Sequence, residues 1–303
     1  MPVDISFTVI IPHYNIPELL ERCLSSIPRR EDVQVIVVDD CSEAGCVDKI
    51  RNGISPNYPN VTFVYQEENG GGGRCRNEAL KYAKGRWLVF ADADDFFSDD
   101  FSQLLDKYKD DDSDIIYFRV GCVFSDDVTK ESDLRDHNKA RIDEFLSNGD
   151  DKTLRYLHSE PWGKFVKREL VCRYGIKFSE TKVCNDYYFS AVSGFHAGTI
   201  KADNTTLYFL TVREGSVSSK TDTVEKIKTR IEVTAAVEKY LRDHGFCMED
   251  KYRVEKIDMR MIALLKKDFF EGVKEFIYLY RQGIAIMPII GKMLMTFIGN
   301  RIR

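Results

Sequence analysis

Several signatures of common protein functions are missing from this sequence. No G-x-x-x-x-G-K-[ST] segment occurs, which excludes a P-loop, and no G-x-S-x-G segment occurs, which excludes the nucleophile elbow of an α/β-hydrolase. The five histidines are dispersed and the eight cysteines form no C-x-x-C pair, so no zinc site is indicated. The first residues lack the basic and apolar regions of a signal peptide. We therefore expect a cytoplasmic protein with reduced thiols.

The charge balance argues against a nucleic-acid partner. The formal net charge is −5, and no arginine-rich stripe or RNA-binding aromatic motif occurs. A hydrophobic content of 43% is that of an ordinary globular protein, and 303 residues suffice for one large α/β domain or two small ones.

The C-terminal segment is apolar and basic, but it is too short to span a membrane. Residues 284–298 are interrupted by Pro288 and Lys292, whereas a spanning helix needs about 20 apolar residues. We expect this segment to lie in the membrane interface, attracted to anionic lipids by Lys292, Arg301 and Arg303. The alternative is a helix packed on the domain or on a second subunit, for example in a homodimer.

The first 120 residues alternate between strand and helix patterns. Strands are expected at 7–11, 33–38, 61–65 and 87–91, and helices at 17–27, 47–52 and 74–83. Repeated β-α-β units with short connections predict an α/β fold, with a Rossmann-like, mostly parallel sheet flanked by helices.

The remainder is less regular. Further strands are expected at 115–120 and 207–212, and the polar stretch 125–151 is expected to be a surface loop, or else an excursion around an acceptor site. A helical pattern begins near residue 224. The predicted division is a first half at 1–120, a second half of the same domain at 121–220, and a C-terminal helical extension at 221–303.

Carboxylates gather where the predicted strands end. The strand at 87–91 is followed by Asp92, Asp94 and Asp95, and the second strand closes on Asp40. The carboxyl ends of parallel strands meet at one edge of a sheet, where ligands bind in open α/β folds. Oxygen ligands suit Mg²⁺ or Mn²⁺, which also bind phosphate oxygens. Together with Arg76 at the start of a helix, these residues predict a nucleotide-diphosphate site.

Four segments carry a resemblance to a known family: VIIPHYN at 9–15, VVDDCS at 37–42, NGGGGRCRN at 69–77 and FADADD at 90–95. In order and spacing they resemble family 2 glycosyltransferases of the GT-A fold, the bacterial group that builds surface polysaccharides from nucleotide-sugars. A weaker continuation lies at 161–168, 185–189 and 213–218. Two positions depart from the family pattern: Asn185 replaces a usual glutamate, and Cys41 replaces a usual glycine, with little consequence expected from Cys41.

The resemblance implies a donor site on the first half of the chain. Asp40 would contact the base, and Asp92 would contact the ribose or the sugar. Asp94 would ligate Mn²⁺ or Mg²⁺ against the diphosphate, and Arg76 would brace the base or the diphosphate. The base pocket would be lined by Pro12 and Tyr14.

The resemblance places the acceptor chemistry on the second half. Asp186 would deprotonate the acceptor hydroxyl, because an alcohol is a poor nucleophile near pH 7. Attack on the anomeric carbon from the face opposite the diphosphate would invert its configuration. Trp162 could offer an aromatic platform to the acceptor sugar, although a core tryptophan is an equally good interpretation.

The predicted function is therefore metal-dependent, inverting transfer of a sugar from a nucleotide-diphosphate sugar, with UDP expected, to a glycan or lipid-linked acceptor. We expect the enzyme on the inner face of a bacterial membrane. One alternative is a nucleotidyltransferase, which would need a glycine-rich loop directly after the first strand. Residues 12–15 are Pro-His-Tyr-Asn and contain no glycine, which argues against it. The other alternative is a catalytically idle nucleotide- or glycan-binding subunit of a polysaccharide assembly complex.

Overall fold

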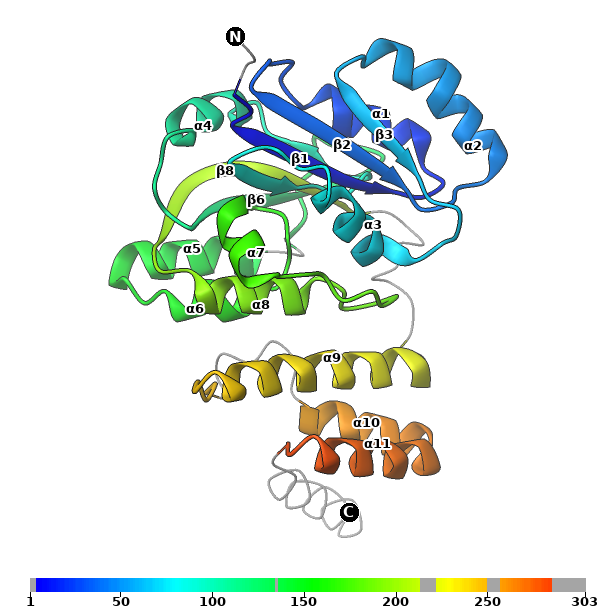
Figure 1. Cartoon of the computed structure of the whole chain (residues 1–303), viewed down its shortest axis with the longest axis vertical. Coiled ribbons are helices and arrows are strands. Elements are labelled where there is room, and N and C mark those ends of the chain that lie inside the picture. Colours follow the sequence, from blue (N-terminus) through cyan, green and yellow to red (C-terminus); the bar gives the residue numbers. More distant parts are fainter. Residues whose placement is uncertain (1–3, 134–135, 213–221, 250–256, 285–303) are drawn as a thin grey trace.

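The computed structural model describes residues 4–133, 136–212, 222–249 and 257–284. Figure 1 shows a twisted sheet with helices against both of its faces, and helices α9, α10 and α11 stacked beyond it at the C-terminal end. The expected α/β architecture with a C-terminal helical extension is confirmed.

The sheet has eight strands in the order β3-β2-β1-β4-β7-β6-β8-β5. Their bounds are β1 Phe7–His13, β2 Val33–Asp39, β3 Val61–Tyr65, β4 Trp87–Phe90, β5 Phe96–Phe97, β6 Ile115–Phe124, β7 Lys164–Lys167 and β8 Ile200–Val212. Strands β3, β2, β1 and β4 pair in parallel, as do β6 and β8. Strand β7 is antiparallel to both neighbours, and it joins the parallel strands β3, β2, β1 and β4 to β6.

The helices connect and cover these strands. Their bounds are α1 Pro17–Ser25, α2 Ala44–Lys49, α3 Gly71–Leu80, α4 Phe101–Tyr108, α5 Asp136–Asn148, α6 Lys152–Leu157, α7 Arg168–Tyr174, α8 Tyr187–His196, α9 Val224–Asp243, α10 Ile257–Lys267 and α11 Phe269–Arg281. A π-helical turn, Ile50–Ile54, continues α2. Pro17 stands at the first turn of α1, where its missing N–H has no intrahelical acceptor in any case.

The central strands are buried on both faces, which explains their continuous apolar sequences. Successive side chains of a strand point to opposite faces. Accordingly, Val9 and Ile11 belong to one hydrophobic cluster, while Ile10 belongs to a second cluster on the other side of the sheet. All three side chains are fully buried. Two packed layers of helices therefore hold the strand ends rigidly in place.

The stretch expected to be a loop contains helix α5, so that prediction was wrong. The helix is fixed by contacts that its own sequence pattern does not reveal. The buried Asn138 accepts a hydrogen bond from the backbone N–H of Val120 at 2.9 Å and pairs with His158 Nε2 at 2.9 Å. Ile142 is fully buried in the core. Tertiary contacts thus stabilise a helix in a polar segment.

Helices α9, α10 and α11 enclose a small core of their own, which includes Ile231, Met261 and Leu279. Helix α9 also packs on the α/β part of the structure, where Val237 and Leu241 meet residues of α6 and α8. Within the described part of the chain, no helix is long and apolar enough to cross a membrane. The apolar, basic segment predicted to contact lipid lies from residue 285 onward, outside the described residues.

Candidate active site

The acidic motif forms a turn just beyond β4, rather than the end of the strand. Asp95 N–H donates to the Asp92 carbonyl at 3.1 Å, which closes the turn. The buried Ala91 and Ala93 alternate with Asp92 and Asp94, which are partly exposed. Asp92 and Asp94 are therefore both partly exposed, but they lie on a turn rather than on a strand.

Two side chains from other elements fix this turn. Arg22 on α1 donates to the Asp94 carbonyl at 2.5 Å, and the Thr211 hydroxyl on β8 donates to the same oxygen at 2.6 Å. The buried Asp95 accepts from Tyr208 Oη at 3.0 Å and from Thr211 N–H at 2.7 Å. Burial, with the nearby charges of Asp94 and Asp92, raises the pKa of Asp95 well above its usual range. Asp95 is thus a structural carboxyl that anchors the turn.

Asp40 follows β2 and is bound to the glycine-rich loop. Its two carboxylate oxygens accept from Gly70 N–H at 2.8 Å and Gly71 N–H at 2.7 Å, and its side chain is almost fully buried. Gly71 adopts a positive φ of 83° at the start of α3. The Asp40 side chain also takes part in a hydrogen bond with the Cys75 thiol, and a carboxylate offers about four lone-pair sites in all. Contact with a nucleobase stays a prediction for Asp40.

The neighbouring loops after β1 and β2 are tied together. Asp39 accepts from His13 Nδ1 at 2.7 Å and from the Ser42 hydroxyl at 2.6 Å, and Ser42 Oγ accepts from the backbone N–H of Asn15 at 2.9 Å. This network lies beside Pro12 and Tyr14, the two residues predicted to line a base pocket. Tyr14 is 50% exposed, as a side chain at the rim of a pocket would be.

Cys41 lies in the left-handed backbone region, with φ of 59°. Left-handed backbone is unfavourable for residues other than glycine by about 1–2 kcal/mol. The substitution of cysteine for the usual glycine therefore has a stability cost, contrary to the expectation of little consequence.

Arg76 is a buried connector between the two halves of the site. Its Nη2 donates to Asp92 Oδ1 at 2.5 Å, and its Nη1 donates to Asn185 Oδ1 at 3.0 Å. The guanidinium carbon lies 5.4 Å from the centre of the Phe178 ring. Arg76 thus joins the acidic turn to the loop before α8. Asn185 keeps the acceptor oxygen needed for this link, which explains why an amide serves where a glutamate is usual.

Asp186 is the N-cap residue of α8, but its side chain makes no capping hydrogen bond. Burial raises its pKa to about 6, the charges of Glu160 and Asp92 act in the same direction, and the charge of Arg76 opposes them. The side chain keeps partial exposure. A partly exposed carboxylate with a pKa near 6 is ionised at pH 7 and basic enough to accept a proton in a transition state.

A buried lysine next to this carboxylate was missed by the sequence analysis. Lys164 on β7 is 1% exposed, and its Nζ donates to the Ser190 hydroxyl of α8 at 3.1 Å and the His158 carbonyl at 3.3 Å. Burial lowers the pKa of Lys164 to about 7, while the charges of Glu160 and Asp186 raise it. Lys164 therefore links β7 to the helix that begins at Asp186.

Trp162 lies beneath the acidic turn. Its ring is 4% exposed and stacks on Tyr208, with 6.0 Å between ring centres and 16° between planes. Tyr208 Oη accepts from Asp92 N–H at 2.8 Å, so Trp162 supports the turn through Tyr208. The structure thus describes a core tryptophan, and a direct contact of Trp162 with an acceptor stays a prediction.

The acidic residues can be tested for their fit to a metal ion. Within the described ranges, no cluster of three or more His, Cys, Asp or Glu side chains could hold an ion with protein ligands alone. Mg²⁺ bound with nucleotides usually takes one or two carboxylates and completes its shell with phosphate oxygens and water. Asp94 has a partly exposed carboxylate that could take this role, and Asp92 is paired with Arg76. The donor set fits a metal that binds together with a diphosphate.

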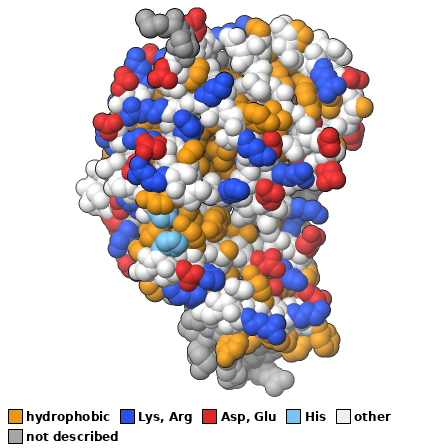
Figure 2. Space-filling model, viewed as in Figure 1, with side chains coloured by type: hydrophobic (Ala, Val, Ile, Leu, Met, Phe, Trp, Pro, Cys, Tyr) orange, Lys and Arg blue, Asp and Glu red, His pale blue; other side chains and the backbone are white. Residues whose placement is uncertain are grey.

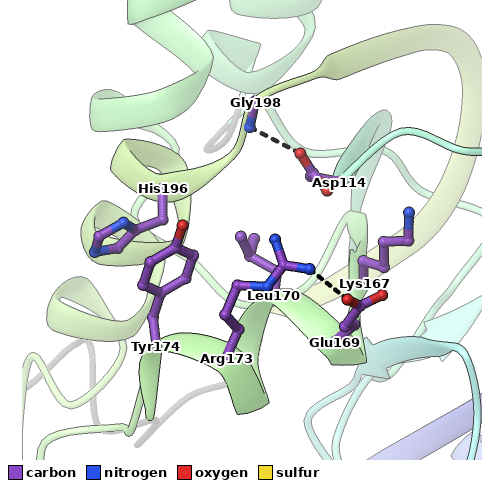
Figure 3. Close-up of a pocket in the computed structure, with 8 residues that line it drawn as sticks. All are labelled: Asp114, Lys167, Glu169, Leu170, Arg173, Tyr174, His196 and Gly198. Atoms are coloured by element: carbon purple, nitrogen blue, oxygen red, sulfur yellow. Dashed lines mark hydrogen bonds and ion pairs between the residues drawn. The ribbon is translucent and has the colours of Figure 1, made fainter.

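Figure 3 shows a separate pocket lined largely by residues of α7 and the end of α8. Its volume is about 310 Å³. Asp114 there accepts from the N–H groups of Gly198 and Thr199, at 2.7 and 3.1 Å, and Arg173 forms an ion pair with Glu169. Tyr174 stacks on His196, with 3.7 Å between ring centres. The polar and aromatic residues that line this pocket thus contact one another, and these contacts explain their presence without a ligand.

Comparison with known proteins establishes the family. A family model described as Glycosyl transferase family 2 matches residues 8–170, more than half of the chain. The chain belongs to this family. The matched region runs from β1 through the acidic turn to β7, so it includes every residue of the proposed donor site.

The relatives and solved structures agree with that assignment. The poly(ribitol-phosphate) beta-glucosyltransferase of Bacillus spizizenii is 38% identical over 94 residues, 29% of this chain and 15% of that enzyme. Staphylococcus aureus TarS 1–349, solved with UDP-GlcNAc, has a TM-score of 0.59 at 23% identity, covering 86% of this chain and 71% of that one. Mannosyltransferase PcManGT from Pyrobaculum calidifontis, solved with GDP-Man and Mn²⁺, has a TM-score of 0.58 at 18% identity, covering 100% and 84%.

These similarities confirm the GT-A fold and the kinship with bacterial surface-polysaccharide glycosyltransferases. At identities below 25%, the two solved structures support the fold alone. The chain spans 15%, 62% and 15% of the lengths of three Bacillus relatives, the first of them the glucosyltransferase above.

Proposed function

We propose that this glycosyltransferase moves a sugar from a UDP-sugar to a hydroxyl of a glycan or lipid-linked glycan, with inversion at the anomeric carbon. The observation that carries the proposal is Asp186, a carboxylate of raised pKa at the start of α8, joined through the neighbouring Asn185 to Arg76 and Asp92. This chain of contacts supports the proposal that Asp186 is a general base close to the turn predicted to bind the sugar and the diphosphate.

The roles follow from these positions. Asp186 accepts the proton of the acceptor hydroxyl as the oxygen attacks, which is worth roughly 10²–10⁴ in rate for a positioned general base. Arg76 keeps Asp92 oriented, so that Asp92 can accept hydrogen bonds from sugar or ribose hydroxyls. Lys164 and Ser190 hold α8, and therefore Asp186, at a fixed distance from β7.

Asp94 would hold a divalent cation, Mn²⁺ or Mg²⁺, which when bound would offset the charge that develops on the departing diphosphate. The support is the position of Asp94 on a turn that Arg22 and Thr211 fix through its backbone carbonyl. PcManGT, which shares the fold, was solved with GDP-Man and Mn²⁺.

The experiment is an NMR assay of UDP-sugar turnover, with a panel of UDP-hexoses and UDP-N-acetylhexosamines and Mn²⁺. The released or transferred sugar should carry the anomeric configuration opposite to that of the donor. Retention of configuration would contradict the direct displacement. A catalytically idle binding subunit would bind the nucleotide but show no turnover with any donor or acceptor.

We also propose that the enzyme works peripherally on the inner face of a bacterial membrane, where a lipid-linked acceptor would be found. The support is the acid-free sequence from 281 to 303, with its four basic residues. The homodimer is the competing explanation for this segment.

A further inference from the structure

Helix α11 carries apolar residues on two adjacent faces. The inner face includes Gly272, Phe276 and Leu279 and packs against α9 and α10. Next to it, five further apolar residues share a second face at helical spacing and are exposed. We name this set the outer face of α11: Phe269 (61% exposed), Phe270 (78%), Val273 (38%), Ile277 (45%) and Tyr280 (74%).

The outer face is not explained by folding. A surface helix needs a single apolar stripe toward its core, and the opposite side is normally polar. Here three aromatic and two β-branched side chains remain in water after the inner face is buried. A contiguous exposed apolar patch of this kind marks an interaction site. Figure 2 shows hydrophobic side chains beside Lys and Arg at the end of the molecule formed by α10 and α11.

The charge of the C-terminal residues indicates which kind of partner the outer face would bind. Residues 257–303 contain eight Lys or Arg and four Asp or Glu, whereas the whole chain has a net charge of −5. The basic side chains of Lys274 and Arg281 belong to α11 itself and are exposed, and Lys274 also pairs with Glu271 on the same helix. The sequence that continues from α11 has no acidic residue between 285 and 303. The C-terminal part of this acidic protein is thus basic and apolar in sequence.

We propose that the outer face of α11 docks on an anionic lipid surface. Aromatic and aliphatic side chains would enter the headgroup and acyl boundary, while Lys274 and Arg281 contact anionic headgroups. A second copy of this chain is a poorer partner, because a two-fold contact would bring two basic ends together. The proposal deepens the peripheral membrane association proposed above, and it assigns the contact to a folded helix rather than to the terminal segment alone.

The test is co-sedimentation of the full-length protein with vesicles of phosphatidylcholine alone and of phosphatidylcholine with 30% phosphatidylglycerol. The docking variant is the triple substitution Phe270→Ser, Ile277→Ser and Tyr280→Ser. We expect its partition coefficient on anionic vesicles to fall at least tenfold. The matched control removes three exposed apolar side chains from the catalytic half and should bind as the unmodified protein does: Tyr82→Ser, Val128→Ser and Leu146→Ser.

A second variant tests the charges without touching the apolar residues. Lys274→Gln with Arg281→Gln should weaken binding to anionic vesicles and leave binding to phosphatidylcholine unchanged. Circular dichroism and thermal melts establish that each variant folds. Equal binding by the docking variant and the control would overturn the proposal.

Two further outcomes would also overturn it. Loss of a dimer in the docking variant, seen by analytical ultracentrifugation, would make the outer face a contact between copies. A large drop in melting temperature with unchanged lipid binding would mean that the chain itself covers this face. Because sedimentation does not measure sugar transfer, a failure here is distinguishable from a failure of the proposed activity.

Discussion

Replacing Asp186 by asparagine should abolish sugar transfer and yet stabilise the protein. The substitution keeps the shape of the side chain and removes both its charge and its basicity. An amide cannot accept the acceptor's proton, so we expect turnover to fall by about 10²–10⁴. The stability gain follows from the raised pKa of Asp186, which means that the folded protein disfavours the ionised carboxylate.

The magnitude can be worked from the pKa. A rise from 3.8 to about 6 corresponds to roughly 3 kcal/mol at 1.36 kcal/mol per unit, and water reaching the partly exposed side chain reduces this to about 1–3 kcal/mol. Between pH 3.8 and 6 the folded state binds more protons than the unfolded state, so the stability of the unmodified protein falls as pH rises through this window. The full penalty is present above pH 6.

The assay is thermal unfolding of the variant and the unmodified protein at pH 7.5 and pH 5. At pH 7.5 the Asp186→Asn variant should unfold at a higher temperature, by roughly 2–4 °C for each kcal/mol. At pH 5 the gain should shrink by about half, because more of the native carboxyl is already protonated. The control is Asp99→Asn, an exposed carboxylate for which no such gain is expected. Unchanged or lower stability at pH 7.5, or retained turnover, would refute the assignment of Asp186 as a desolvated base.

Other consequences follow from backbone geometry and buried charge. A methyl group on Gly73 would lie 2.1 Å from the Ser179 carbonyl oxygen, so Gly73→Ala should lower the free energy of unfolding by about 1–3 kcal/mol. Gly45 has open space around it, so the control Gly45→Ala should raise the free energy of unfolding by up to about 1 kcal/mol. Urea unfolding measures both. Cys41→Gly should relieve the left-handed backbone strain of about 1–2 kcal/mol, but the greater freedom of glycine in the unfolded chain offsets part of it. The expected net gain is about 0.5–1 kcal/mol, and a loss would contradict the strain. Because the pKa of Lys164 is lowered to about 7, the unfolded chain binds an extra proton between pH 7 and 10, and stability should rise with pH in that window. Lys164→Met should remove that slope in melts from pH 7 to 9, and a persisting slope would count against burial as its origin.

The sequence was a good guide wherever local pattern decides structure. The apolar runs at 7–11, 33–38 and 87–91 correspond to β1, β2 and β4, because a fully buried strand needs a continuous apolar segment and such segments are visible in one sequence. The positions of Asp40 and Asp92 just beyond β2 and β4 could be predicted from these strands, whereas the roles of the two residues stay predictions.

The rest depended on contacts between distant residues. Lys164 lies in segment 161–168, the weaker continuation of the family pattern. Nothing in the neighbouring sequence indicates that its amine is buried between His158 and Ser190. Trp162 could be assigned to the core only once Tyr208, 46 positions later, was seen to stack on it. Helix α5 was missed because Asn138 and Ile142, rather than a regular apolar stripe, attach it to the domain.

The central claim, a metal-dependent nucleotide-sugar site, is tested most directly by thermal shifts with UDP, GDP, dTDP, CMP and NAD⁺, each with and without Mn²⁺. A ligand present at a hundred times its Kd stabilises the folded state by about 2.7 kcal/mol. The account predicts a shift with one nucleoside diphosphate, UDP, that requires Mn²⁺, disappears in Asp94→Ala and persists in Asp186→Asn. No shift with any nucleotide, or an equal shift in Asp94→Ala, would contradict it.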